Sequence, residues 1–268
     1  MKPKHLLWTG EWIDVEHFPL NQNRSFLYGD GFFETMRWDN FKECRLWDFH
    51  WNRISKTILA LHFPWPAHLD KAHFFEMIAK QIPENEESDI RVKIIFFRTG
   101  TGRYAPEESK LGLWFEIEDL HQPWIQQISR IGKAKTLHLS KSTFSWIKST
   151  SALPYVLAGI EKSHRDLDDL VLCNGNGLVV EGSFACIFWS KNGQLYLPDE
   201  KLGGLDSCMR RFLIQHWHEN KIEVLHVSAS WEEIENAEWI GFGSGTGIRF
   251  WLNNMQELPY HVLPQFSL

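Results

Sequence analysis

The stretch WIKSTSALPYVLAG, residues 146–159, contains one lysine, and the interpretation of the fold depends on the role of that lysine. Lys148 stands just before a run whose apolar spacing predicts a helix that ends near Arg165. Its neighbours are small or hydroxylated and carry no charge. A lysine at a helix start is most often a solvated surface residue, but an amine in uncharged company is also a candidate nucleophile. Other segments have to separate these two interpretations.

The composition is that of an ordinary globular protein, with 268 residues of which 43% are hydrophobic and 23% charged. A chain of this length can build one large domain or two intimate ones. Fourteen Trp and nineteen Phe indicate an aromatic-lined interior or interface. The net charge of -6, without a long basic run, gives no support for binding to nucleic acid.

The N-terminal segment and the cysteines predict a cytoplasmic protein. MKPKHLLWTGEW lacks the apolar stretch of a signal peptide, and no window approaches the length of a membrane span, so no membrane partner is expected. The histidines show no metal-binding spacing, and His50 is interpreted as helix-start packing. Neither a disulfide framework nor a metal site is expected, because no C-x-x-C pair occurs among Cys44, Cys173, Cys186 and Cys208.

The first part of the chain reads as mixed α and β. Asp39-Asn40 is a suitable hairpin turn, and Asp48 is a suitable helix N-cap. β-Branched and aromatic residues favour strands in IRVKIIFFR and LGLWFEIEDL, with a loop between them. The expected elements are strands over 32–38, 41–47, 90–98 and 111–120, and helices over 48–63 and 70–82.

The second part is richer in strands. A boundary near Pro123 predicts domains over 1–120 and 121–268, with Lys148 in the second. Strands joined by hairpins, such as the one at Asn192-Gly193, favour an α+β class over a regular βαβ array. The expected elements are strands over 134–140, 168–173, 178–189, 194–198, 221–227 and 238–251, and helices up to about Arg165, over 205–220 and in a short acidic segment before 238.

Three features on separate segments suit one cofactor. Lys148 offers an amine, Glu181 a carboxylate within an apolar run, and Arg53 a cation for a phosphate. The helix start GGLDSCMRR (203–211) and the glycine-rich GSGTG (243–247) add backbone N–H groups for an anion. Pyridoxal phosphate (PLP) needs such a set: a Schiff-base lysine, an acid beside the pyridine nitrogen and a phosphate cradle. Each residue alone is more often a surface charge or a turn, so spacing leaves this interpretation open.

The same segments resemble the class IV, or fold-type IV, PLP enzymes, in the same order along nearly the whole chain. That family comprises branched-chain aminotransferases, D-amino-acid aminotransferases and 4-amino-4-deoxychorismate lyases. IKSTSALPYVLAGIEK (147–162) resembles its I-K-x-L-N…N-V-L-A-x-x-E segment, which implies that Lys148 is the catalytic, cofactor-bound lysine. LVVEGSFACIF (178–188) resembles V-x-E-G-x-x-x-N-x-F, which implies that Glu181 faces the pyridine nitrogen.

The remaining motifs concern phosphate and substrate. HWNRI (50–54) is similar to H-x-x-R-L, which implies that Arg53 binds the cofactor phosphate. YGDGFFETMR (28–37) and FRTGTGRYAP (97–106) are similar to motifs that imply substrate-side roles for Phe33 and Arg103. GGLDSCMRR and GSGTGI are similar to the phosphate-binding helix and late loop, which implies cofactor contacts from Cys208, Met209 and Ser244.

The resemblance also implies an architecture: two α/β domains with the cofactor at their junction, in a homodimer whose neighbouring subunit helps to close the active site. The chain departs from the family pattern at Ser149-Thr150-Ser151, Cys186, Ser207 and Phe33. These departures leave the lysine, glutamate and arginine intact but affect the substrate pocket. The reaction is therefore the least determined feature.

Three features favour the lyase, which forms 4-aminobenzoate for folate biosynthesis. The chain is short for a class IV aminotransferase, its phosphate helix reads C-M-R as in the lyases' I-M-R, and its GTGRY loop resembles the lyases' G-G-R-G-Y. A D-amino-acid or branched-chain aminotransferase is the alternative, because the same lysine and glutamate serve both reactions. A non-catalytic relative that binds a metabolite is the third hypothesis, and Lys148, Glu181 and Arg53 argue against it.

Overall fold

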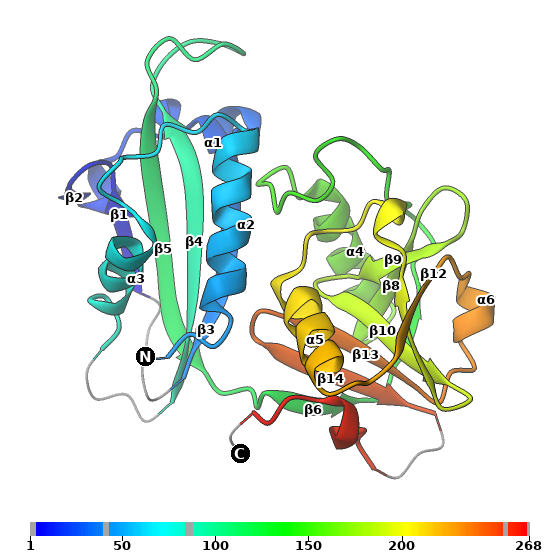
Figure 1. The fold of residues 1–268 in the computed structure, drawn as a ribbon. Coiled ribbons are helices and arrows are strands. Elements are labelled where there is room, and N and C mark those ends of the chain that lie inside the picture. Colours follow the sequence, from blue (N-terminus) through cyan, green and yellow to red (C-terminus); the bar gives the residue numbers. More distant parts are fainter. Residues whose placement is uncertain (1–3, 40–42, 84–87, 254–256, 267–268) are drawn as a thin grey trace. The chain divides into compact units, whose positions relative to one another are not determined.

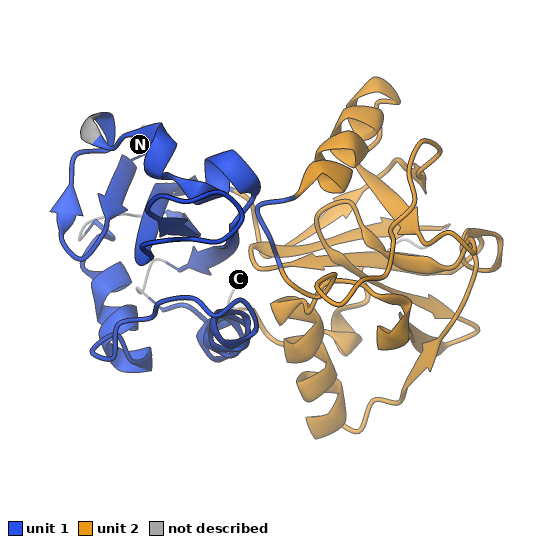
Figure 2. Ribbon diagram, turned by 90° about the horizontal axis from the view of Figure 1, so that it is seen from above, with its two compact units in different colours: residues 1–121, 148–151 blue, residues 122–147, 152–268 orange. Residues whose placement is uncertain are grey.

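The computed structural model describes residues 4–39, 43–83, 88–253 and 257–266, and its contacts divide the chain into two compact units. The first unit comprises Met1–His121 with Lys148–Ser151, and the second comprises Gln122–Ile147 with Ala152–Leu268 (Figure 2). Each unit combines helices with β-sheet, which confirms the predicted α+β class.

An antiparallel sheet is the centre of the first unit. In the described part of the chain it consists of β1 (Lys4–Trp8), β2 (Trp12–Ile13), β3 (Gly31–Trp38), β4 (Asp89–Thr99) and β5 (Lys110–Leu120), in the order β2-β1-β5-β4-β3 (Figure 1). The long β4–β5 pair runs in register from Asp89 opposite Leu120 to Thr99 opposite Lys110. Both strands were expected from their composition, and the structure confirms them.

Aromatic residues join the helices of the first unit to this sheet. The helices are α1 (Arg24–Tyr28), α2 (Trp47–Ala60) and α3 (Lys71–Ala79), with short 3₁₀ turns at Val15–His17 and Leu20–Gln22. The rings of Trp47 on α2 and Phe75 on α3 lie 5.2 Å apart, and those of Phe74 and Phe96 on β4 lie 5.9 Å apart. The abundant tryptophan and phenylalanine thus fill the space between helices and sheet.

The hairpin expected around Asp39-Asn40 is wrong in its second strand. Residues 40–42 lie outside the described residues. Residues 43–46 form no strand, and Trp47 is already the first residue of α2. The partner of β3 is β4, with Gly31 opposite Phe97 and Trp38 opposite Ile90. Asp48 therefore lies in the first turn of α2 rather than at its N-cap, which is Leu46. The helix expected over 70–82 is confirmed as α3, with Asp70 as its N-cap.

Two sheets form the second unit in the residues described. The larger has the order β12-β11-β10-β13-β14-β6 and the smaller β7-β8-β9 (Figure 1). The strands are β6 (Ile125–Ile128), β7 (Ile131–Lys133), β8 (Asp169–Cys173), β9 (Val179–Gly182), β10 (Cys186–Lys191), β11 (Gln194–Pro198), β12 (Val224–Val227), β13 (Trp239–Ser244) and β14 (Gly247–Leu252). The helices are α4 (Leu153–His164), α5 (Cys208–Glu219) and α6 (Trp231–Ile234), with 3₁₀ turns at Glu200–Leu202 and Tyr260–Val262.

Apolar side chains hold these layers together. Ala158 of α4 packs with Leu170, Leu172 and Val180 from β8 and β9. On α5, the ring of the fully buried Trp217 lies 5.5 Å from that of Phe188 on β10. The helices α4 and α5 are thereby fixed to the strands that carry the candidate site residues of this unit.

Most predicted elements of the second unit are confirmed. The hairpin turn forms at Asn192 and Gly193, whose φ angles of 53° and 72° are those of a tight turn between β10 and β11. The strand expected over 178–189 is interrupted between Gly182 and Cys186, so that β9 and β10 join different sheets. The strand expected over 134–140 is wrong: Lys135 and Thr136 N–H groups donate to the Glu161 carboxylate instead of to a neighbouring strand.

The contacts differ from the predicted domains at one segment. The first unit ends at His121, next to the expected domain boundary, but the segment Lys148–Ser151 also belongs to the first unit. Phe33 N–H donates to Lys148 C=O at 2.9 Å, and Thr150 N–H donates to Gly31 C=O at 3.0 Å. The segment therefore extends the edge of β3, a long-range pairing that local sequence does not reveal.

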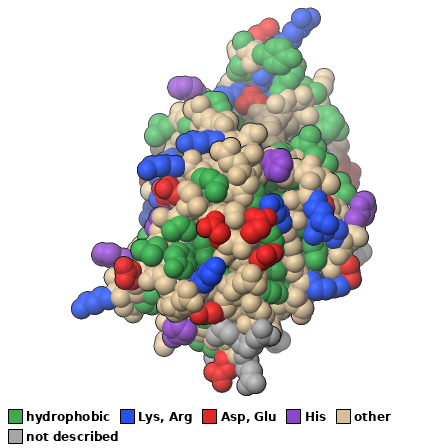
Figure 3. All heavy atoms as spheres, turned by 90° about the vertical axis from the view of Figure 1, so that its right-hand side faces the viewer, with side chains coloured by type: hydrophobic (Ala, Val, Ile, Leu, Met, Phe, Trp, Pro, Cys, Tyr) green, Lys and Arg blue, Asp and Glu red, His purple; other side chains and the backbone are tan. Residues whose placement is uncertain are grey.

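Charged side chains of both signs are interspersed on the face of the molecule in Figure 3. Among the described residues, no helix is both long enough and apolar enough to cross a membrane.

Candidate functional site

Lys148 lies against an aromatic ring of the first unit. Its Nζ is 4.4 Å from the centroid of the Phe33 ring, within the range of a cation–π contact. The backbone pairing of Lys148–Ser151 with the start of β3 fixes this position. Lys148 is five residues before α4 begins, so it is placed by a strand edge and not, as expected, by a helix start. Its side chain is only partly buried.

A close approach of two backbones supports the Lys148 segment. Gly29 has a φ of 66°, and a Cβ at this position would lie 2.2 Å from Ser151 Oγ. Thr150 Oγ1 donates to the carbonyl groups of Gly29 and Gly31, at 3.1 Å each. Glycine at position 29 is therefore required both by its backbone conformation and by the space that the lysine segment occupies.

A second cation lies near the same ring and was missed by the sequence reasoning. Lys93 on β4 places its Nζ 5.9 Å from the Phe33 centroid. It is opposite Thr35 in the β3–β4 register, so Phe33 and Lys93 share one face of the sheet. The sequence shows only that Lys93 interrupts an apolar run, and its place beside Phe33 follows from the β3–β4 register.

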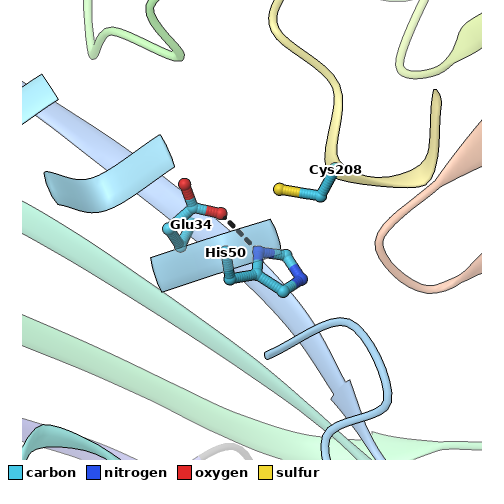
Figure 4. A group of neighbouring side chains, drawn as sticks. All are labelled: Glu34, His50 and Cys208. Carbon is cyan, nitrogen blue, oxygen red and sulfur yellow. Dashed lines mark hydrogen bonds and ion pairs between the residues drawn. The ribbon is translucent and has the colours of Figure 1, made fainter. Parts of the chain in front are cut away.

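Arg53 belongs to a buried charged cluster of the first unit. Its Nε and Nη2 donate to the two oxygens of Glu34, at 2.8 and 2.6 Å. His50, one helical turn earlier, donates from Nδ1 to Glu34 at 2.7 Å (Figure 4). Glu34 is on the face of β3 covered by α2, and Glu34, His50 and Arg53 are 1%, 0% and 6% exposed.

The electrostatics of this cluster favour a charged Glu34. Burial alone would raise the pKa of the Glu34 carboxyl group. The Arg53 charge and the hydrogen bonds from His50 and Arg53 outweigh burial and lower that pKa from 4.5 to about 2. His50 is thus more than the helix-start packing expected from sequence: together with Glu34 it fixes the guanidinium of Arg53.

Arg103 lies on an exposed loop whose backbone carbonyl groups accept hydrogen bonds from a buried arginine. Arg24, only 2% exposed, donates to the carbonyl groups of Gly102 at 2.8 Å and of Arg103 at 2.7 Å. Arg24 also forms an ion pair with Asp30 at 2.9 Å. The loop is thereby held in one conformation while the Arg103 side chain stays exposed.

Glu181 is the buried acid of the second unit. It is 5% exposed on β9, and its Oε2 accepts a hydrogen bond from Leu205 N–H at 2.9 Å. Its Oε1 accepts a hydrogen bond from the hydroxyl of Tyr155 on α4. Burial raises the pKa of Tyr155, and the adjacent Glu181 charge raises it further, so the phenol remains a donor. The sequence reasoning selected Glu181 but missed Tyr155.

The start of α5 and the β13–β14 turn lie together in the second unit. Ser207 caps α5 by accepting a hydrogen bond from Arg210 N–H, and Cys208 and Met209 are the first two helical residues. A Cβ on Gly243 would lie 2.7 Å from Met209 Cγ, so β13 packs tightly against this helix start. Ser244 follows Gly243, and its Oγ accepts from Thr246 N–H at 3.3 Å. A helix N-terminus and a hydroxyl-rich turn are an arrangement suited to an anion.

Cys186 replaces the asparagine of the family motif beside this turn. It is opposite Gly243 in the β10–β13 register and is buried. Burial raises the pKa of its thiol to about 11, although a hydrogen bond with Ser207 opposes the shift. The thiol is therefore protonated at neutral pH, and we treat it as a packing residue.

The comparisons with known proteins show the family. The family model described as amino-transferase class IV matches residues 31–250. An aminodeoxychorismate lyase of Vibrio harveyi is 25% identical over 205 residues, which are 75% of this chain and 73% of the relative.

Solved structures support the same fold. A putative 4-amino-4-deoxychorismate lyase of Legionella pneumophila has a TM-score of 0.78 at 23% identity, covering 93% of this chain and 94% of that one. A branched-chain aminotransferase of Thermoproteus uzoniensis, solved with norvaline, has a TM-score of 0.78 at 20% identity, covering 91% and 85%. At these identities the structures show the fold, which is fold-type IV, and the family model gives the conclusion: the chain belongs to the class IV aminotransferase family.

Proposed function

We propose that the protein is a PLP-dependent 4-amino-4-deoxychorismate lyase that supplies 4-aminobenzoate for folate biosynthesis. The observation that carries the proposal is the Lys148 amine, which the paired backbone of its segment holds 4.4 Å from the Phe33 ring. The backbone of the lysine thus has a fixed anchor, which favours a covalent cofactor link at its amine.

The residues present fit PLP. Glu181 is a buried carboxylate whose two oxygens accept hydrogen bonds from Tyr155 and from Leu205 N–H, and we propose that it faces the protonated ring nitrogen. For the phosphate we propose Arg53, the N–H groups of Cys208 and Met209, and the Ser244 hydroxyl. When bound, PLP supplies an electron sink for a substrate carbanion.

Lys148 is the proposed acid–base group of the reaction. It takes the proton from the ring carbon that bears the amino group of 4-amino-4-deoxychorismate. The bond between the ring and the enolpyruvyl oxygen then breaks, the ring becomes aromatic, and a proton is returned to the departing three-carbon group as it becomes pyruvate. Substrate and products balance without an oxidant, a reductant or water.

The substrate side of the proposal rests on Phe33, Arg103 and Lys93. The Phe33 ring offers a flat apolar surface next to the Lys148 amine. The substrate carries two carboxylates, and Lys93 is a cation near that same ring. We propose Lys93 and Arg103 as carboxylate-binding residues.

The lyase is favoured over an aminotransferase by sequence rather than by geometry. The C-M-R and GTGRY segments and the Vibrio harveyi relative support the lyase. The alternative, a D-amino-acid or branched-chain aminotransferase, uses the same Lys148 to move the α-proton of an amino acid. Because the chain is also similar to the Thermoproteus uzoniensis aminotransferase, the assays must include the aminotransferase reaction.

One pair of assays decides between them. The purified protein, loaded with PLP, is incubated either with 4-amino-4-deoxychorismate or with an amino acid and 2-oxoglutarate. Release of 4-aminobenzoate and pyruvate in equal amounts supports the lyase. Amino-group exchange with D-alanine or a branched-chain amino acid, without lyase turnover, would replace it by the aminotransferase. A protein that acquires no visible absorption band with PLP would be the non-catalytic relative.

We further propose that the enzyme is a cytoplasmic homodimer whose partner subunit helps to close the active site. This proposal rests on the family resemblance and on the exposed aromatic surface, such as Tyr104 at 91% and Phe26 at 66% exposure. Sedimentation is expected to show a dimer at assay concentrations. A monomer with full activity would contradict it.

A further inference from the structure

The Glu181 carboxylate is held from two sides within the second unit. Tyr155 on α4 donates to Oε1, and Leu205 N–H, from the loop before α5, donates to Oε2 at 2.9 Å. The loop passes close by, since a Cβ on Gly204 would lie 3.5 Å from Oε2 and 3.1 Å from Val180 Cγ1. A carboxylate fixed at both oxygens has one orientation, which a main-chain donor alone would not impose.

Tyr155 is itself fixed by packing. Its ring packs on the core cluster that includes Ala158, Leu170 and Val180. Neighbouring residues on α4 are exposed, with Leu153 at 66% and Val156 at 55%, so Tyr155 is the side chain of this turn directed to the interior. The elevated pKa of its phenol, caused first by burial and then by the Glu181 charge, means that it stays protonated throughout the physiological pH range.

We propose that Tyr155 is a positioning residue, which keeps Glu181 anionic and oriented toward the ring nitrogen of the cofactor. This inference rests on the proposed function, because it concerns the nitrogen of bound PLP. A hydrogen bond donated to a carboxylate favours its charged form. An anionic Glu181 in turn favours a proton on the ring nitrogen, and only the protonated ring is a strong electron acceptor. Tyr155 stands where the resembling family segment reads Asn before V-L-A, so the motif itself does not supply this donor.

The first test needs no cofactor. The chain has five tyrosines, so ¹³Cζ-tyrosine NMR gives few signals, and the Tyr155 signal is the one lost in Tyr155→Phe. Glu181→Gln is expected to shift the Tyr155 signal and to lower the pH at which it titrates. Tyr196→Phe is the matched control, because Tyr196 is a partly buried tyrosine of the same unit, stacked on Trp189 at 5.8 Å. A Tyr155 signal that is unaffected by Glu181→Gln would overturn the inference.

The second test observes the ring nitrogen itself. The wild type, Tyr155→Phe and Tyr196→Phe are loaded with PLP labelled with ¹⁵N in the ring, and the ¹⁵N shift is followed against pH. Loss of one hydrogen bond to a charged group should lower the pH at which the nitrogen loses its proton by about one unit in Tyr155→Phe. Tyr196→Phe should titrate as the wild type does. Identical titration of Tyr155→Phe and wild type would overturn the role of Tyr155.

The two tests separate the inference from the proposed function. If the wild type takes up no PLP, the proposed function fails and the role toward the ring nitrogen fails with it, whatever the tyrosine spectrum shows. If PLP binds and the tyrosine signal responds to Glu181→Gln but the ¹⁵N titration does not respond to Tyr155→Phe, only the inference fails. Thermal melting of each variant checks that the comparison is made between folded proteins.

Discussion

Arg53 and Glu34 form a two-point ion pair, with N–O distances of 2.8 and 2.6 Å, in which both side chains are almost completely buried. Replacing Glu34 by glutamine removes the negative charge that the Arg53 guanidinium faces. Breaking a buried pair from one side is costly, so we expect Glu34→Gln to lower the free energy of unfolding by about 3 kcal/mol. Urea denaturation at pH 7 measures this change.

The control for this prediction is the same substitution at Glu116. Glu116 on β5 pairs with Arg91 at 2.9 Å, but both side chains are about one-quarter exposed, at 26% and 25%. Partly exposed pairs contribute about 1 kcal/mol or less, so Glu116→Gln should have a small effect. Equal destabilisation by the two substitutions would contradict the buried-pair argument.

The Glu34 carboxyl group also predicts a particular dependence of stability on pH. Its pKa falls from 4.5 to about 2 on folding, because Arg53 and His50 outweigh burial. A lowered pKa contributes stability that is complete above the unfolded value of 4.5 and is lost as the pH falls toward 2. The shift corresponds to about 3 kcal/mol. We therefore expect wild type and Glu34→Gln to converge in unfolding free energy below pH 4.5, as measured by urea titrations at several pH values. Parallel curves over that range would exclude Glu34 as the titrating group.

The Lys148 amine predicts where the cofactor is attached. After reduction with borohydride, the PLP-loaded wild type should carry the cofactor on the peptide that contains Lys148, as identified by mass spectrometry. Lys148→Ala should lose the attachment and the visible absorption band. Lys93→Ala is the matched control, because Lys93 lies 5.9 Å from the same Phe33 ring. Attachment at Lys93 in the wild type would refute the assignment of Lys148.

Local sequence was sufficient to predict those elements that depend on the apolar face of one strand or on the residues of one turn. The alternating apolar residues of β4 and β5 and the Asn192-Gly193 turn are of this kind. The segment FKECRLW looks like a strand by composition, yet Trp47 begins α2 because its ring packs on Phe75 of α3. Residues 134–140 fail as a continuous strand because the Glu161 carboxylate accepts the N–H groups of Lys135 and Thr136, although Ala134 and Leu139 still donate to carbonyl groups of β8. In both cases a contact from elsewhere in the chain overrides local preference.

The candidate site shows the same limit. Motif spacing selected Lys148, Arg53 and Glu181, whose roles stay proposals. It did not select Glu34, Lys93 or Tyr155, because each becomes informative only through a partner distant in sequence. Lys148 itself was assigned to a helix start, whereas its segment pairs with β3 more than 110 residues earlier, a relationship that only the fold reveals.

Lys93 predicts a defect in substrate binding. If it binds a substrate carboxylate, Lys93→Met should raise KM about tenfold, the effect of losing roughly 1.4 kcal/mol of charge-assisted contact, with a smaller change in kcat. Arg103→Met should behave similarly. Lys110→Met, at the exposed start of β5, is the control and should leave both constants unchanged. Steady-state kinetics with 4-amino-4-deoxychorismate test this, and a Lys93→Met enzyme with an unchanged KM would remove Lys93 from the substrate site.

Gly29 is expected to be indispensable for the position of the lysine segment. In Gly29→Ala the new Cβ would meet Ser151 Oγ at 2.2 Å, and the backbone would keep a φ of 66° that alanine adopts with strain. The strain costs about 1 kcal/mol, and relief of the clash displaces the Ser151 hydroxyl in the segment that pairs with the edge of β3. We expect a lower melting temperature and a lower yield of borohydride-trapped cofactor on Lys148.

A double variant separates the two causes. In Gly29→Ala/Ser151→Ala the hydroxyl oxygen is gone, and the nearest side-chain atom is Cβ of residue 151 at 3.4 Å, an ordinary contact. Cofactor trapping should therefore recover, whereas the melting temperature should stay below that of Ser151→Ala because the backbone strain remains. If Gly29→Ala traps the cofactor as well as the wild type does, the close approach of Gly29 and Ser151 does not position Lys148.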